Sequence, residues 1–206
     1  MSNDRGTKNL VTEAKEAVVS SIRGLGDITS ALVDAVSNTV VHALKGTRAT
    51  GTELLGLVFD SVRGAVHGVA EVGTEAGGAA KSIMVGALRG TKQVGEAGIE
   101  TVSGSAAALV KGTSDVGGNV GAAAKGAVEG AIVAARDLGI AVEDAASAAG
   151  SGALKAAGEI GGTAVREVRN VLAKTISGVK VVVKEPFQRE ERSPRDNSRP
   201  SSSGPR

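Results

Sequence analysis

A 22-residue period is the feature of this sequence that most constrains its fold. Three near-copies, "ALKGT", "ALRGT" and "LVKGT", occupy residues 43–47, 87–91 and 109–113, and their glycines are 44 and 22 residues apart. Both spacings are multiples of 11. Because 22 residues make six turns of about 3.67 residues, close to the 3.6 of an α-helix, the period predicts an all-α protein built from repeats.

Eight units of 22 residues align when the chain is cut from Ser20, the last one incomplete. The third position, the aliphatic column, holds Ile22, Leu44, Val66, Leu88, Val110, Ile132, Leu154 and Ile176. The fourth position, the cation column, includes Arg23, Lys45, Arg89, Lys111 and Lys155. The eighth position, the acid column, holds Asp27, Glu71, Gln93, Asp115, Asp137 and Glu159. Glycine recurs at the fifth position and at the tenth, where it is found at Gly51, Gly73, Gly95, Gly117, Gly139 and Gly161.

The unit is amphipathic on a helical wheel, which places positions 3, 6, 10, 14, 17 and 21 on one side. Each complete repeat also carries two to five glycines, and each glycine costs about 1 kcal/mol in a helix relative to alanine. We therefore expect long helices that are weak in water and form against an apolar surface. Since no proline precedes Pro186, turns are poorly marked, and helices folded back as hairpins are an open alternative. In a bundle, the tenth-position glycines would let two backbones approach closely.

Composition divides the chain into three parts. Residues 1–19 form a partly disordered N-terminal segment, residues 20–183 the repeat region, and residues 184–206 a disordered tail rich in Arg, Ser and Pro. No run of 18 apolar residues lacks charge, and charges within the first 30 residues leave no room for a signal peptide. We expect a cytoplasmic protein that is peripheral on lipid bodies or membranes.

Residues that could carry out chemistry are nearly absent. The 206 residues include no Cys and two His, which lie 25 positions apart, and no metal-ligand, nucleophile or phosphate-loop motif is present. We expect no catalytic residue, no cofactor and no bound metal, so the protein is not predicted to be an enzyme. Cations and carboxylates alternate along the repeats and the chain has no Trp or Tyr, so we expect no nucleic-acid binding either.

The repeats resemble a known type of lipid-binding sequence. "LKGTRATG", "LRGTKQVG" and "VKGTSDVGG" are similar to the 11-residue repeats of perilipins and synucleins, and the resemblance covers roughly residues 20–178. The period differs from that of the longest perilipin arrays, whose repeat unit is longer. The resemblance implies reversible binding to lipid droplets or membranes. Phasins, which coat polyester granules, and late-embryogenesis-abundant proteins, which protect drying cells, are weaker resemblances.

The leading hypothesis is a non-enzymatic helical coat or scaffold on a lipid-droplet, granule or membrane surface. The aliphatic column would face the lipid, and the cation column would flank the headgroups with its stems along the apolar surface. Two alternatives stay open. One is a stress or desiccation protectant that remains disordered until dried, and the other is a self-assembling helical structural protein.

Overall fold

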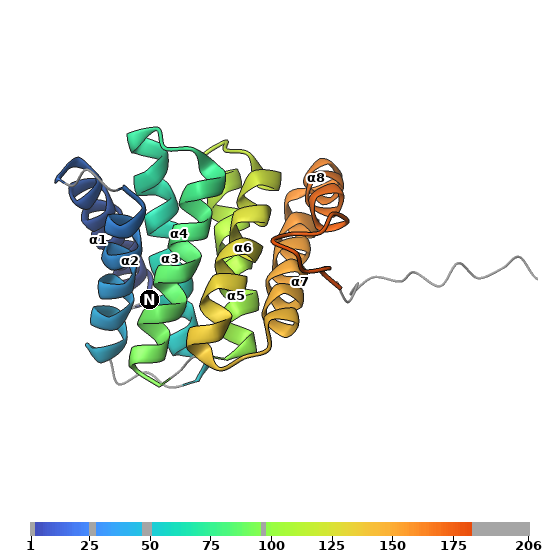
Figure 1. The fold of residues 1–206 in the computed structure, drawn as a ribbon. Helices are drawn as coiled ribbons and strands as arrows, with labels where there is room; N and C mark the ends of the chain where they lie inside the picture. The colour runs from blue at the N-terminus through green and yellow to red at the C-terminus, as the bar shows by residue number, and fades with distance from the viewer. Residues whose placement is uncertain (1–2, 25–27, 47–50, 96–97, 183–206) are drawn as a thin grey trace, which may run out of the picture.

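The computed structural model describes residues 3–24, 28–46, 51–95 and 98–182, with the side chains of residues 3–9, 21–24 and 28 excepted. This part of the chain is all-α, as the period predicts, and contains eight helices (Figure 1). They are α1 (Asn3–Gly24), α2 (Ile28–Lys45), α3 (Thr52–Val72), α4 (Ala76–Gln93), α5 (Ile99–Asp115), α6 (Val120–Leu138), α7 (Val142–Ile160) and α8 (Gly162–Leu172). The helix α1 starts inside the N-terminal segment, and the predicted disordered tail lies outside the described residues.

The helices form antiparallel hairpins that stack into two layers. Each helix packs against the next one along the chain and against the helix two places further on. The odd-numbered helices α1, α3, α5 and α7 therefore share one layer, and the even-numbered helices α2, α4, α6 and α8 share the other. Helices within a layer run parallel, and the stack proceeds from α1 and α2 at one end to α7 and α8 at the other (Figure 1). One repeat thus supplies one helix and one turn, and the long helices expected from the sequence are folded back.

The tenth-position glycines lie at helix ends, which corrects their expected place on the apolar face. All six have positive φ, for example +77° at Gly73 and +70° at Gly139. The N–H of Gly73 donates to the carbonyl of Ala70, and the N–H of Thr74 donates to that of Val69. This pair of bonds satisfies the last free carbonyls of α3 and needs a left-handed residue, which glycine adopts without a Cβ clash. These glycines therefore mark the turns, which no proline marks in this part of the sequence.

The close backbone approach expected of small residues occurs at positions 1 and 5 of the unit instead. A Cβ built on Gly86 in α4 would lie 2.6 Å from the carbonyl oxygen of Val33 in α2. A Cβ on Gly90, one helical turn further along α4, would lie 2.8 Å from the carbonyl oxygen of Ser37. Glycine is required because any Cβ would force the two parallel helices apart. The helix penalty of these glycines is therefore offset by packing within a layer.

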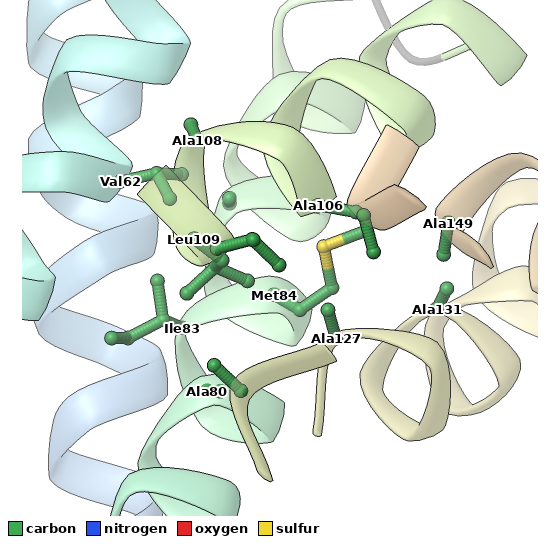
Figure 2. Packing of buried hydrophobic residues seen from close by; sticks show 14 of the residues in the cluster. Val62, Ala80, Ile83, Met84, Ala106, Ala108, Leu109, Ala127, Ala131 and Ala149 are labelled. Atoms are coloured by element: carbon green, nitrogen blue, oxygen red, sulfur yellow. The ribbon is translucent and has the colours of Figure 1, made fainter. Parts of the chain in front are cut away.

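Small side chains also fill the interior between the layers. Met84 of α4 lies beside Ala106 of α5 and Ala127 of α6, with Ala131 and Ala149 further along the same interior (Figure 2). All five of these residues have essentially no exposed surface. Because each alanine buries little area, many close contacts replace the few large ones that aromatic residues would provide.

Both ends of the stack are closed by residues that break the repeat. At positions 19 and 1, which are small in α4 to α7, α2 carries the exposed Asn38 and the exposed His42, so its outer side is polar. At the other end, Ile176 and Val179 pair as an isolated antiparallel bridge after α8. Ile176 and Val181 are buried in the main core. This segment covers the end of the stack that a further hairpin would occupy.

Candidate interaction surfaces

The aliphatic column lies inside the bundle. Leu88 and Val110 have no exposed surface, and the other buried members, exposed by at most 8%, are Leu44, Val66, Leu154 and Ile176. Ile132 is half-buried, and the side chain of Ile22 lies outside the described part of the chain. In this closed form the column makes the core, so it could meet a lipid surface only if the helices separated.

The cation column joins helices two places apart in the stack. Arg89 of α4 pairs with Asp137 of α6 at 3.4 Å, and Lys111 of α5 pairs with Glu159 of α7. In both pairs the cation precedes its carboxylate by 48 residues, which is two repeats and one helical turn. The acid column is therefore the partner of the cation column. We call these ion pairs between helices the ladder, and the sequence contains both of its columns.

The ladder changes register toward the N-terminus. Arg63 of α3 pairs with Asp115 at 3.0 Å over 52 residues. Lys15 of α1 pairs with Glu71 at 2.7 Å, and here the separation along the chain is longer by one further helical turn. The cation-column residues Lys45 and Lys155 are exposed, and the side chain of Arg23 is not described. Because the paired side chains are roughly half exposed, each pair contributes at most about 1 kcal/mol to stability. The ladder therefore helps to select which helices lie side by side, but it adds little to the stability of their contact.

The pair between Lys111 and Glu159 also changes the pKa of the carboxyl group. The hydrogen bond from Lys111, followed by its charge, lowers the pKa of Glu159 below its ordinary value, and Lys155 adds to the effect. Asp60 on α3 behaves in the opposite way. Burial raises its pKa above the ordinary value, and the nearby charge of Arg63 partly offsets that rise.

The "ALRGT" copy at residues 87–91 has a separate role for each residue type. Leu88 fills the core, Arg89 pairs across to α6, and Gly90 lies against the backbone of α2. Thr91 is fully buried, and its hydroxyl donates to the carbonyl of Ala87 at 2.6 Å, so burial leaves this hydroxyl with a partner. The motif recurs because each helix packs against equivalent neighbours and needs the same residue types at these contacts.

Among the hollows in the described part of the chain, one lies in the core and one lies beside the ladder. A cavity of about 230 Å³ lies between α3, α4 and α5 and is lined mainly by aliphatic residues such as Val69, Ile83 and Leu109. It is smaller than the roughly 300–1,000 Å³ usual for small-molecule sites. A groove of about 380 Å³ crosses α3, α5 and α7 beside Phe59. Its ionic groups are Arg63, Lys111 and Glu159 of the ladder, together with Asp60 and Lys155. Neither hollow assembles a nucleophile with a base.

Comparisons with known proteins add no assignment. Neither the family models, nor the curated proteins, nor the solved structures contain a match to this chain. The resemblance to perilipin and synuclein repeats therefore stays a prediction. Within the described residues, none of the helices combines the length and apolar character that crossing a bilayer requires.

Sequence reasoning missed the small residues at position 1 of the unit. This column packs against the helix two places earlier and consists of Gly64, Gly86, Ala108, Gly130 and Gly152. Its signal was present, since five consecutive units carry Gly or Ala there and position 5 is also small. Together the two positions make the small-xxx-small pattern of closely packed helices, one helical turn apart.

Proposed function

We propose that this protein is a non-enzymatic helical protein that binds the surface of a lipid droplet, granule or membrane by opening its bundle. The aliphatic column would exchange its contacts with neighbouring helices for contacts with lipid. A fully buried aliphatic side chain gains about 1.5–3 kcal/mol on leaving water, and this gain is similar in a protein core and in a lipid surface. The exchange therefore needs little net energy.

The observation that carries the proposal is the alignment of Val66, Leu88 and Val110 on the inner sides of consecutive helices. Each helix has one apolar side, and glycine turns such as Gly73 and Gly117 join the helices. Rotation about these turns would place all the apolar sides on one plane. Because alanine supplies much of the interior, closing the bundle buries less area per residue than a core of large side chains would.

Disulfide locks test whether opening is needed, and the natural chain has no cysteine to interfere. A Cβ on Gly112 of α5 would lie 3.3 Å from that of Val66 in α3, and a Cβ on Gly121 of α6 would lie 3.7 Å from that of Glu167 in α8. Disulfides need about 3.5–4.5 Å between these atoms. The Gly121–Glu167 distance lies within this range, and the Gly112–Val66 distance is about 0.2 Å short of it, so a small shift of the two helices suffices. The variants V66C/G112C and G121C/E167C therefore tie neighbouring helices within each layer.

We expect the reduced variants to float with a neutral triglyceride emulsion coated with phosphatidylcholine, and the oxidised variants to remain in the aqueous phase. The four single-cysteine variants, treated with the same oxidant, serve as controls and should float. If oxidised and reduced forms float equally, the inner face is not the lipid contact and the proposal fails. The protectant and the self-assembling protein remain alternatives, and no contact in the described structure favours either one.

A further inference from the structure

From α3 onward, a second period, twice the length of the repeat unit, distinguishes the even-numbered helices from the odd-numbered ones. Positions 18 and 7 of the unit carry cations in α4, α6 and α8, and these are Lys81, Lys92, Lys125, Arg136 and Arg169, whereas position 18 of α2 is the buried Ser37. The same positions in α3, α5 and α7 hold Phe59, Ala70, Ser103, Ser114, Ser147 and Gly158. Position 18 of one unit and position 7 of the next are three helical turns apart, so the two cations of one helix project from the same side. We call these five residues the cation rows.

The total charge of the helices follows the same division. The helices α4, α6 and α8 contain seven Lys and Arg against three Asp and Glu, whereas α3, α5 and α7 contain three against eight. From α3 to α8 the bundle therefore has one basic layer and one acidic layer. Such a charge distribution orients the molecule in the field of an anionic surface.

The outward stripe of α6 shows what kind of surface would fit. It runs through Lys125, Glu129, Val133 and Arg136 at spacings of four, four and three residues. The Lys125 side chain is 59% exposed. The side chain of Glu129, its ion-pair partner at 3.7 Å, is only 25% exposed and is thus less accessible to a surface. Val133 is 44% exposed between the two cations. An aliphatic side chain flanked by cations suits a bilayer interface, where it can enter below the headgroups.

We propose that the outer face of α4, α6 and α8 docks the closed bundle on an anionic phospholipid bilayer. The cation rows would lie at the lipid phosphates, Val133 would enter the interface, and the acidic layer would face away. This docking rests on the proposed lipid-binding function and supplies its first step, before the bundle opens. It also assigns headgroup contact to residues other than Arg89 and Lys111, which pair between helices in the ladder. Within the cation rows, Lys92 donates to the main-chain carbonyl of Asp137, and Lys125 pairs with Glu129 of its own helix.

Matched charge variants test this face. The variant K81Q/K125Q/R136Q removes three cations from the basic layer, and R63Q/K111Q/K155Q removes three from the acidic layer, so both have the same net charge. Partitioning is measured by flotation with phosphatidylcholine vesicles of which about one third of the lipid is phosphatidylserine, at about 0.1 M salt. Since one cation near an anionic surface contributes about fivefold, we expect the first variant to bind about 100-fold more weakly. The second should stay within about threefold of the parent, and V133S alone should lose about threefold.

Several outcomes would overturn the docking face. Equal losses by the two triple variants would mean that net charge alone drives binding, and no binding of the parent to the anionic vesicles would remove the basis of the proposal. Tighter binding to a short DNA duplex than to vesicles would make nucleic acid the partner. Self-association that is lost in K81Q/K125Q/R136Q would instead assign the face to a second copy of the chain.

The disulfide lock separates this proposal from the opening of the bundle. Oxidised V66C/G112C should bind the anionic vesicles as well as the reduced protein does, because the outer face needs no rearrangement. If only the anionic-vesicle binding fails while the neutral emulsion still binds the reduced protein, the docking face is wrong and the opening stands. If only the emulsion binding fails, the opening is wrong and the docking face stands.

Discussion

Gly130 of α6 lies directly against the backbone of Lys81 in α4. A Cβ built on Gly130 would be 2.6 Å from the carbonyl oxygen of Lys81 and 2.6 Å from the Cβ of Met84. Real side chains do not approach so closely, and a backbone carbonyl cannot rotate away as a side chain can. The distance between these two helices is therefore set by the missing side chain.

Replacing Gly130 with alanine should accordingly destabilise the fold by about 1–3 kcal/mol, the usual effect of overpacking. Gly158 of α7 is the matched control because it is also helical and nothing lies within 4 Å of its added Cβ. Gly158→Ala should stabilise the protein by up to about 1 kcal/mol through helix propensity. Urea unfolding followed by far-ultraviolet circular dichroism measures both, and shifts of the same sign would contradict the packing role of Gly130.

The tenth-position glycines should respond to backbone conformation and not to space. Gly139 has φ of +70° and nothing within 4 Å of an added Cβ. Gly139→Ala should cost about 1–2 kcal/mol because alanine disfavours the left-handed region, whereas Gly139→Asn should cost less. The same urea midpoints test this order. Equal losses for Ala and Asn would indicate a cause other than φ.

These two glycine positions show why the sequence predicted helices but not their boundaries. The period of the repeat fits one straight, continuous helix as well as one helix followed by a turn. The choice depends on the backbone angles at Gly73 or Gly139, and residue type alone does not fix those angles because glycine is allowed on both sides. Only three-dimensional packing distinguishes a glycine that ends a helix from one that touches a neighbour, such as Gly86.

The aliphatic column should behave as a protein core in the absence of lipid. Leu88 is fully buried, so Leu88→Ala should destabilise the bundle by about 2–5 kcal/mol. Val133 lies in the cation column, two repeats after Arg89, and is 44% exposed. Val133→Ala should change stability by less than about 0.5 kcal/mol. Cooperative thermal unfolding with these two midpoints would support a folded lipid-free protein, and a broad transition that neither substitution moves would contradict it.

The ion-pair ladder was visible in the sequence only as two separate columns. The fourth position is often basic and the eighth often acidic, which alone suggests neighbours one helical turn apart on the same helix. The structure instead pairs Arg89 with Asp137 and Lys111 with Glu159 across helices. Because the partners lie more than two repeats apart along the chain, the pairing follows from the stacking of every second helix and could not be derived from one unit.

Asp60 should make the protein less stable as the pH rises. Burial raises the pKa of this carboxyl above its ordinary value of 3.8, so the folded state disfavours the charged form. The resulting loss of stability develops as the pH rises from 3.8 through the raised pKa and is complete above it. Asp60→Asn should therefore raise the melting temperature at pH 7 by about 1–3 °C and leave it unchanged at pH 3. An equal rise at both values would exclude ionisation as the cause.

Glu159 should show the opposite dependence on pH. Its hydrogen bond with Lys111 lowers its pKa below the ordinary value of 4.5, so the folded state favours the charged form. The stability that this gives is fully present above pH 4.5 and is lost as the pH falls through the lowered pKa. Glu159→Gln should lower the melting temperature at pH 7 by about 1–3 °C and have no effect at the acid end of the range, below the lowered pKa. Lys111→Gln should do the same, and the double variant should add little, because both changes break one bond. Additive losses in the double variant would mean that the two side chains stabilise the bundle independently of each other.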